Sequence, residues 1–351
     1  MGGIESHIHE VSSRLVALGH EVTVLSADPT GQLPRQETAD RIRFIRVPTW
    51  LSKSDYSLAP ALYRRIMSCN FDVAHIQGYH TFVPPLGMLA AVRKKVPFVI
   101  TFHSGGHSSG LRKLLRPVQW KALAPLVRKA SRHVGVSDFE ATLFSDAMGI
   151  PRRLFTIIPN GAELPAAPAV PVKKCGTRII SIGRLEQYKG HHLAIQALHK
   201  LQWRLPDVHL LILGSGPYES ELRKLVKTLR LEQKVSFQSI PPLDRKSMAS
   251  VLSTADLVVL LSEYEAHPVA VMEALALGRR VLTSDTSGFA ELAQKGLTQT
   301  VSLKSSPVEI AATMEAALRV PPRSAKITLP TWDDCANKLN EVYHAAARPP
   351  V

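Results

Sequence analysis

The sequence predicts an α/β protein made of two doubly wound domains, each a parallel sheet covered by helices on both faces. From about residue 177 onward, short β-branched runs alternate with helical patterns of roughly 10 to 15 residues, which is the sequence form of repeated βαβ units. The residues before 165 show a similar alternation, and a proline-containing stretch separates the two halves. The length of 351 residues suits two such domains.

The N-terminal domain is predicted over residues 1–164. Its expected strands are EVTVLSA, IRFIRV, VAHIQG, FVITFHS, HVGVS and FTIIPNG. A doubly wound domain normally opens with a buried strand that leads into a glycine-rich turn and a helix, yet this chain begins at the turn itself, MGGIESHIHEVSSRLVALGHEV. We therefore expect the sheet to lack its first strand, an element of about 5 to 6 residues at or near its centre. This pattern suggests a truncated or mis-started chain.

The predicted linker covers residues 165–176, because Pro165, Pro168 and Pro171 forbid a helix there and favour an extended chain. The C-terminal domain is predicted over residues 177–335, and residues 336–351 as a C-terminal helix or tail. Its expected strands are RIISIG, VHLLILG, KVSFQ, LVVLLS and RRVLTS, with helices between them. Such strands belong to a sheet that is buried on both faces.

The composition is that of an ordinary globular protein, with 45% apolar and 21% charged residues. The cysteines Cys69, Cys175 and Cys335 are far apart and odd in number, which predicts neither a disulfide framework nor a metal site. No apolar run reaches the roughly 18 to 20 residues that span a bilayer, and the N-terminus lacks a signal-peptide pattern. We expect a cytoplasmic protein that is neither exported nor integral to a membrane.

The net charge of +14 is unevenly distributed, because no Asp or Glu occurs between Asp72 and Asp138. Within that interval, residues 111–133 mix Leu, Trp and Val with many Lys and Arg side chains. Such a basic amphipathic segment can lie on an anionic membrane surface or meet a phosphorylated acceptor. The alternative is a solvated helix face near a site that handles anions. Nucleic acid is disfavoured, because no aromatic-interleaved basic motif appears.

Ligands of open parallel sheets bind at the carboxyl ends of the strands, so the loops after the strands are the places to examine. The loop in SIGRLEQYKGHH carries Gly183, Arg184 and Lys189 between a strand and a helix. Arg184 can form a forked pair of hydrogen bonds and Lys189 can act as a point charge, which suits a diphosphate. A surface Arg or Lys in a loop is more often simply solvated.

The next loop, in LLILGSGPYESEL, places Gly214 and Gly216 directly after a strand. A nicotinamide site is disfavoured, because Glu219 replaces the third glycine of the G-x-G-x-x-G pattern and the strand is the second of its domain. We expect these glycines to let a nucleotide or the facing domain approach the backbone.

The third loop precedes a helix in EYEAHPVAVMEALALG. Pro268 is predicted at the first helical position and Gly278 just beyond the helix end, so Glu265 lies in the loop and Glu273 within the helix. The free amides of Val269 and Ala270 would then face an anion at the helix N-terminus. Because a carboxylate would repel that anion, we interpret both glutamates as acceptors of sugar and ribose hydroxyl hydrogen bonds.

These motifs, in this order, resemble family-4 retaining glycosyltransferases of GT-B fold. The resemblance runs over nearly the whole chain, through GGIE, VAHIQG, TFHS, VS, IPNG, SIGRLEQYKG, GSGP and ADLVVLLSEYEAHPVAVMEALALG. It implies two Rossmann-like domains facing across a cleft, with a nucleotide-diphosphate sugar held mostly by the C-terminal domain. Glu265 and Glu273 match the E-x7-E motif of that family.

The resemblance also implies residue roles. Arg184 and Lys189 would hold the diphosphate, Glu273 the ribose, and Glu265 the transferred sugar. Catalysis would rest on Arg184, Lys189, Glu265 and His103, the last beside the sugar on the N-terminal side. The implied donor-binding set is Gly3, Gly183, Arg184, Lys189, Gly214, Glu265, Val269, Ala270 and Glu273.

Some positions remain less well explained. His75 and Gln77 match a family His-x-His in which the second histidine is changed, and His80 and His107 are interpreted as loop histidines. The common Gly-Phe-Gly after the first glutamate is Ala266-His267-Pro268 here, so the resemblance does not identify the donor sugar.

The implied reaction moves a hexosyl unit with retention from the nucleotide sugar to a hydroxyl acceptor, lipid-linked or saccharide, in glycolipid or cell-surface polysaccharide synthesis. No metal and no cofactor is expected, because two cations neutralise the diphosphate and no Asp-x-Asp motif is present. Peripheral attachment to the inner face of the plasma membrane through residues 111–133 is part of this hypothesis. The alternatives are a nucleotide-sugar epimerase of similar form, and a non-catalytic remnant or regulatory subunit.

Overall fold

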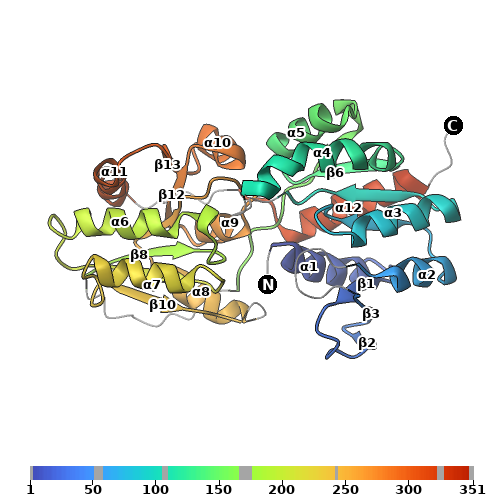
Figure 1. The fold of residues 1–351 in the computed structure, drawn as a ribbon, viewed down its shortest axis with the longest axis horizontal. Helices are drawn as coiled ribbons and strands as arrows, with labels where there is room; N and C mark the ends of the chain where they lie inside the picture. The colour runs from blue at the N-terminus through green and yellow to red at the C-terminus, as the bar shows by residue number, and fades with distance from the viewer. Residues whose placement is uncertain are drawn as a thin grey trace.

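The structure is a computed structural model that describes residues 3–50, 58–104, 110–165, 176–241, 244–321 and 328–347. It has two lobes (Figure 1). The N-terminal lobe is formed by the residues up to 165, and the C-terminal lobe by residues 176–321. The last helix returns to the N-terminal lobe. Residues 166–175 of the predicted linker and His107 lie outside the described residues, as do the side chains of residues 111–114.

The N-terminal lobe contains helices and strands in alternation. They are α1 (Gly3–Ala17), β1 (Thr23–Asp28), β2 (Gln36–Ala39), β3 (Ile42–Pro48), α2 (Pro60–Ser68), β4 (Ala74–Gln77), α3 (Val83–Lys94), β5 (Phe98–Thr101), α4 (Gly110–Val127), β6 (Arg132–Gly135), α5 (Asp138–Met148), the short 3-10 helix η1 (Arg152–Leu154) and β7 (Phe155–Ile157). Every strand expected from the sequence is present, and β2 is an addition.

The strands of this lobe form two sheets among the described residues. One has three strands in the order β1-β3-β2, in which β2 runs antiparallel, and the other has four parallel strands in the order β4-β5-β6-β7. A doubly wound domain would carry one continuous sheet. The break leaves β1 and β4 as edge strands.

The C-terminal lobe has the complete doubly wound arrangement. Its elements are β8 (Thr177–Ile182), η2 (Gln187–Lys189), α6 (His191–Leu201), β9 (Val208–Leu213), α7 (Glu219–Thr228), β10 (Val235–Gln238), α8 (Arg245–Ser253), β11 (Leu257–Leu260), α9 (Val269–Ala276), β12 (Arg280–Ser284), α10 (Ser287–Gln294), β13 (Gln299–Val301) and α11 (Pro307–Arg319). The six parallel strands follow the order β10-β9-β8-β11-β12-β13. The predicted α/β fold with parallel sheets is confirmed, and β13 is an addition.

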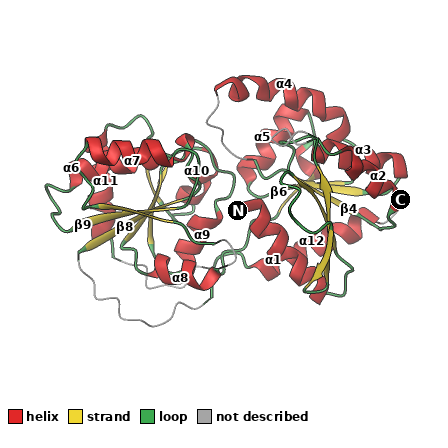
Figure 2. Ribbon diagram, turned by 60° about the horizontal axis from the view of Figure 1, so that its bottom comes forward, coloured by secondary structure: helices red, strands yellow, loops and turns green. Residues whose placement is uncertain are grey.

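Each face of this sheet has its own hydrophobic core, because neighbouring residues of a strand point to opposite faces. Ile179 packs with the core beneath α6, α7 and α11, whereas Ile180 packs with the core beneath α8, α9 and α10. The two layers of helices are visible on either side of the sheet in Figure 2. The nearly continuous apolar strands of the sequence are therefore explained by burial on both faces.

The last helix, α12 (Trp332–Ala347), follows the C-terminal lobe in sequence but packs on the N-terminal lobe (Figure 1). Trp332 and Leu339 share a core with Val11 of α1 and Val99 of β5. The helix begins at Trp332, four residues before the tail expected at residue 336, so its first turn lies within the predicted C-terminal domain range.

Candidate functional site

The candidate site lies where two neighbouring strands of the C-terminal sheet end. β8 and β11 are adjacent in the sheet, yet the helices that follow them, α6 and α9, belong to cores on opposite faces. The chain direction therefore diverges at the carboxyl ends of these two strands, which is where open α/β sheets bind ligands, and we call this strand-end region the crevice. The loop after β8 carries Lys189, and the loop after β11 carries Glu265.

Lys189 and Glu265 form an ion pair in this crevice. The Lys189 Nζ donates a hydrogen bond to the Glu265 Oε1, and only 15% and 12% of the two side chains are exposed. Gly190 permits the close approach of the two loops, because its φ is +72° and a Cβ there would lie 2.0 Å from the Leu261 carbonyl oxygen. Burial acts to lower the pKa of Lys189, but the Glu265 carboxylate and the Tyr188 hydroxyl together outweigh it and raise that pKa. Lys189 is therefore a buried, charged ammonium group.

Gly183 and Arg184 begin the same loop. Gly183 has a φ of +146°, and its amide donates to the Leu213 carbonyl oxygen at 3.0 Å. Arg184 is 60% exposed, and its nearest carboxylate is that of Glu186, at 3.4 Å from the guanidinium. The structure thus brings Lys189 and Glu265 together, whereas Arg184 stands at the exposed rim of the loop.

The backbone of this loop is fixed by His191, the first residue of α6. Burial lowers the pKa of His191 to about 4, so the ring is neutral. Its Nε2 lies 3.1 Å from the Arg184 carbonyl oxygen and its Nδ1 lies 2.8 Å from the Ser181 hydroxyl. The ring therefore donates to the Arg184 carbonyl oxygen and accepts from the Ser181 hydroxyl, which ties the peptide after Arg184 to strand β8.

Gly214 is explained by contact within the C-terminal lobe. Its φ is +153°, and a Cβ there would lie 1.9 Å from the Gly183 carbonyl oxygen. Gly216 lies similarly close to the backbone of Leu185. The close approach that we expected from a nucleotide or from the facing domain is made in the structure by the loop after β8.

The start of α9 differs from the prediction by one residue. Pro268 is the N-cap, with φ −75° and ψ 106°, and Val269 is the first helical residue. The prediction of Pro268 at the first helical position is therefore wrong, because its ψ is extended. Val271 donates to the Pro268 carbonyl oxygen at 3.1 Å, so the amides of Val269 and Ala270 precede the first intrahelical bond, as expected. Gly278 does lie just beyond the helix end, with φ +68°.

Glu273 lies in the middle of α9 and is 3% exposed. Arg245, the first residue of α8, donates a hydrogen bond to its Oε1. Burial raises the pKa of Glu273, and the Arg245 charge opposes that rise. The sequence did not single out Arg245, because no spacing rule links a residue at a helix start to a carboxylate 28 positions away.

His103 lies after β5, in the N-terminal lobe. Its φ of +46° is unusual for a residue other than glycine, and such strain is frequent at functional sites. Its Nε2 lies 2.7 Å from the Gln77 Oε1, and the His80 ring lies 3.2 Å from the His103 carbonyl oxygen. Burial lowers the pKa of His103 well below 6.5, so the ring is neutral. No described contact joins it to Lys189 or Glu265.

His7 and Asn160 were not predicted as site residues. The His7 ring of α1 meets the His103 ring edge-on, with centroids 4.6 Å apart, and its Nδ1 lies 2.9 Å from the Asn160 Oδ1. The Nε2 of His7 has no partner among the described residues. Gly3 begins the same helix. Only the turn that starts the chain, GGIESHIHE, indicated that α1 would face the site.

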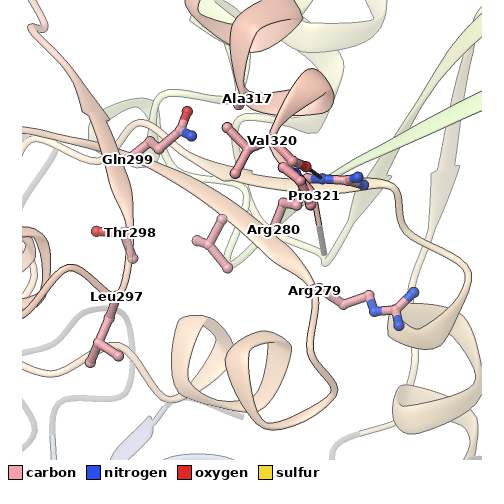
Figure 3. A pocket seen from close by; sticks show the side chains of 9 residues that line it. Arg279, Arg280, Leu297, Thr298, Gln299, Ala317, Val320 and Pro321 are labelled. Atoms are coloured by element: carbon pink, nitrogen blue, oxygen red, sulfur yellow. Dashed lines mark hydrogen bonds between the residues drawn. The ribbon is translucent and has the colours of Figure 1, made fainter. Parts of the chain in front are cut away.

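A small pocket of about 50 Å³ lies elsewhere (Figure 3). Its lining includes Arg280 and Gln299, the first residues of β12 and β13, and Val320 beyond α11. It therefore opens at the amino ends of the strands, the edge opposite the crevice. Ligand pockets usually enclose about 300 to 1,000 Å³, so it is too small for a nucleotide sugar.

No group of three or more His, Cys, Asp or Glu side chains in the described part of the chain is arranged to hold a metal ion. None of the helices seen there combines the length and the apolar character needed to cross a membrane.

Comparison with known families gives two successive matches. The model of the family described as Glycosyltransferase Family 4 matches residues 1–164, and the model described as Glycosyl transferases group 1 matches residues 168–328.

Several curated proteins are similar over most of the chain. A phosphatidyl-myo-inositol mannosyltransferase of Mycolicibacterium smegmatis is 29% identical, over 84% of this chain and 75% of its own. A glycogen synthase of Mycobacterium tuberculosis is 27% identical, over 99% of this chain and 92% of its own. A GDP-mannose:cellobiosyl-diphosphopolyprenol alpha-mannosyltransferase of Xanthomonas oryzae is 26% identical, over 91% and 84%.

Solved structures share the fold. Sucrose-phosphate synthase from Thermosynechococcus elongatus superposes with a TM-score of 0.79 at 17% identity, covering 98% of this chain and 93% of that one. The Anabaena protein HepE in complex with UDP-glucose gives 0.72 at 18% identity, over 98% and 92%. WaaG, a glycosyltransferase involved in lipopolysaccharide biosynthesis, gives 0.70 at 17% identity, over 99% and 94%. The GT-B fold implied by the resemblance is confirmed.

Proposed function

The chain belongs to the group 1 glycosyltransferases of family 4, and on this premise we propose that it is a retaining, metal-independent hexosyltransferase. It moves a hexosyl unit from a nucleotide-diphosphate sugar to a hydroxyl acceptor, in the synthesis of a glycolipid or a cell-surface polysaccharide. The curated relatives include mannosyltransferases and a glycogen synthase, which supports sugar transfer over epimerisation.

The observation that carries this proposal is the Lys189–Glu265 pair at the divergence of β8 and β11. A nucleotide sugar offers a complement to both members, because its diphosphate is anionic and its sugar hydroxyls are donors. On binding, the diphosphate would form an ion pair with the Lys189 ammonium group, and the sugar hydroxyls would donate hydrogen bonds to the Glu265 carboxylate. Arg184 supplies a second cation from the exposed rim, and the amides of Val269 and Ala270 supply the partial positive charge of a helix start.

The nucleoside end of the donor would extend along α9 to Glu273. This carboxylate is buried and already accepts a hydrogen bond from Arg245, and its remaining lone pairs can accept bonds from the two ribose hydroxyls. Gly183 and Gly214 would form part of the backbone surface that contacts the diphosphate. Gly3 and His103 would approach from the N-terminal lobe, with the neutral His103 ring beside the transferred sugar.

We propose transfer with retention, as the family resemblance implies. The acceptor oxygen bonds to the anomeric carbon on the face from which the diphosphate departs. The bond from that carbon to the phosphate oxygen breaks with its electron pair on the oxygen, which takes the acceptor proton. Lys189, Arg184 and the start of α9 stabilise the leaving charge, and this preorganised stabilisation is usually the largest contribution to catalysis.

The donor is tested by screening UDP-glucose, GDP-mannose and related nucleotide sugars for nucleotide release, with and without membrane extract and in the presence of a chelator. We expect one donor to be turned over in an acceptor-dependent way, and NMR of the product to show the anomeric configuration of the donor. Inverted product would disprove retention, and loss of activity with the chelator would disprove metal independence. Binding without turnover would favour the non-catalytic alternative.

The proposal also includes contact between α4 and an anionic membrane surface that carries the acceptor. In the described part of the segment, Leu115 and Val118 are 49% and 65% exposed, and Lys121 beside them is also exposed. In contrast, the Arg128 side chain is hydrogen-bonded within the protein, because its Nε donates to the Met148 carbonyl oxygen at 2.8 Å. The names of two relatives include a phosphatidylinositol and a polyprenol, which supports a lipid-borne acceptor.

Flotation with vesicles tests this surface. We expect the protein to float with phosphatidylglycerol vesicles at low salt, to float less at high salt, and not to float with pure phosphatidylcholine. A combined Val118→Ser, Lys121→Glu variant should lose flotation and keep donor turnover in solution. Failure of the unchanged protein to float at low salt would exclude the membrane contact.

A further inference from the structure

Tyr264, the residue before Glu265, reaches across to the N-terminal lobe. Its hydroxyl donates to the Ser104 Oγ at 2.7 Å. The edge of its ring meets the Phe139 ring, with centroids 5.6 Å apart, and the Arg116 guanidinium lies 5.4 Å from its ring centroid. The Tyr264 side chain of the C-terminal lobe therefore packs against three residues of the N-terminal lobe, which we call the socket: Ser104, Phe139 and Arg116.

Within this socket, Ser104 is fixed by Glu140, which is fully buried at the start of α5. Its Oε1 accepts hydrogen bonds from the Ser104 amide and hydroxyl, at 2.5 and 2.7 Å, and its Oε2 accepts from the Val136 amide at 2.9 Å. Because the Ser104 hydroxyl proton points to Glu140, the lone pairs of that oxygen are left to accept from Tyr264. The position of the Ser104 oxygen is thus fixed by its own lobe.

The other end of the Glu265 loop is also tied to the N-terminal lobe. The Asn160 Nδ2 donates to the His267 carbonyl oxygen at 3.3 Å, and the Asn160 Oδ1 lies 2.9 Å from the His7 Nδ1. Glu265 therefore lies between two residues, Tyr264 and His267, that each bond to the facing lobe.

Glu265 itself is held by the C-terminal lobe. Its amide donates to the Ser287 Oγ at 2.8 Å, and its carbonyl oxygen accepts from the Gly288 amide at 2.8 Å. The backbone of the carboxylate-bearing residue is thus fixed by α10, whereas the residues on either side of it are fixed by the opposite lobe. A displacement between the lobes that keeps these hydrogen bonds would therefore change the conformation of this short loop.

We propose that Tyr264 is a positioning residue for the transfer reaction, which sets the Glu265 carboxylate through its bond to Ser104 in the facing lobe. The proposal rests on the proposed function, because Glu265 matters only if it binds the transferred sugar. Placement of the sugar then depends on contact between the lobes, whereas binding of the nucleotide part, at Lys189 and Glu273, does not. Loss of the Tyr264–Ser104 bond should therefore lower kcat and leave nucleotide affinity unchanged.

A double-mutant cycle of Tyr264→Phe and Ser104→Ala tests the bond. The phenylalanine keeps the ring contacts with Phe139 and Arg116 and removes only the hydroxyl. We expect each single variant to lower kcat about five- to tenfold, the equivalent of one hydrogen bond, with the KM for the donor changed less than twofold. The double variant should be no slower than Ser104→Ala alone, because that substitution already removes the bond to Tyr264 together with the one to Glu140.

Tyr63→Phe on α2 is the matched control, because it deletes a tyrosine hydroxyl away from the crevice, and it should turn over like the unchanged protein. Affinity for the nucleoside diphosphate alone, measured by calorimetry, should be equal in all variants and shows that each one is folded. Hydrogen exchange of a peptide spanning residues 263–268 should be faster to the same extent in both single variants and in the double variant.

The outcomes separate the inference from the proposed function. If the unchanged protein turns over no donor, the proposed function fails, and the exchange rates still report whether Tyr264 fixes the loop. If the unchanged protein is active, and Tyr264→Phe matches it in kcat or the two substitutions act additively, then Tyr264 does not position Glu265 through Ser104. A rise in KM at constant kcat would equally overturn the inference.

Discussion

Lys189 and Glu265 neutralise each other in the free protein, at a position where water can solvate neither side chain fully. Such a pair is costly when one member is removed, because the other charge is left buried. For the same reason its members interact strongly with a ligand that replaces the missing partner. The Lys189 ammonium group is thus already positioned to stabilise a leaving diphosphate, whose negative charge increases as the sugar departs.

Replacement of Lys189 by alanine tests this role at the level of one side chain. We predict a hundred- to thousand-fold fall in kcat with the donor found by screening, which corresponds to about 3 to 4 kcal/mol of lost transition-state stabilisation. Lys224→Ala is the control, because Lys224 is 71% exposed and lies on α7. Turnover of Lys189→Ala at the rate of the unchanged protein would refute the assignment.

Arg245 is expected to keep Glu273 able to accept hydrogen bonds. Burial already raises the pKa of Glu273, and removal of the opposing Arg245 charge should raise it further. Protonation of the carboxyl group takes away an acceptor for ribose hydroxyls, so nucleotide affinity of Arg245→Ala should fall as the pH is lowered from 8 to 6. Calorimetry with the nucleoside diphosphate measures this. Glu273→Gln should bind weakly at both pH values, and a pH-independent Arg245→Ala would contradict the prediction.

The sequence predicted the place of a residue in the fold well where that residue follows a strand, and it did not predict which side chains meet across the fold. Lys189 and Glu265 are predictable because both stand in loops at the carboxyl ends of strands, and parallel strands bring such loops to one edge. The contacts Arg245–Glu273 and Tyr264–Ser104 join side chains from different helices or lobes. Their partners depend on how the elements pack, which no local pattern records.

The loops after β8 and β11 are elements whose mutual approach depends on Gly190. We predict that Gly190→Ala destabilises the protein by more than about 3 kcal/mol, because the alanine must adopt a positive φ and its Cβ would meet the Leu261 carbonyl oxygen. Gly296→Ala is the matched control, with a similar φ of +66° but open space around the site, and should lose only about 1 kcal/mol. Equal urea midpoints for the two variants would show that the loop contact is unimportant.

The strands and helices were predicted best where the pattern is long or the residues are β-branched. Both additions, β2 (QETA) and β13 (QTV), lack the apolar run that made an equally short strand such as β5 (FVIT) predictable. The one-residue shift at Pro268 is of the size by which helix ends commonly differ, and it depends on a ψ value that sequence does not determine.

The whole molecule shows where sequence patterns reach their limit. Two doubly wound lobes could be predicted because each repeats the same alternation of strands and helices. The return of α12 to the N-terminal lobe could not, because its amphipathic pattern indicates that one face is buried but not against which partner. Trp332 and Leu339 complete a core begun by Val11 of α1, more than 300 residues earlier.

That interface also buries histidines, and it should make the stability of the whole chain depend on pH. Burial lowers the pKa of His75 to about 3, whereas the unfolded value is 6.5, so below pH 6.5 the unfolded chain binds a proton that the folded chain does not. The stability that His75 contributes is therefore present above pH 6.5 and is lost as the pH falls. From pH 7.5 to 5.5 we predict a loss of about 1 kcal/mol from this residue, measured as the difference in urea unfolding between the unchanged protein and His75→Gln at both pH values. Tyr343→Phe is the control, because it removes the hydroxyl 2.6 Å from the His75 Nδ1 but leaves the histidine free to titrate. It should lower stability equally at both pH values, and a pH dependence that His75→Gln leaves unaltered would contradict the prediction.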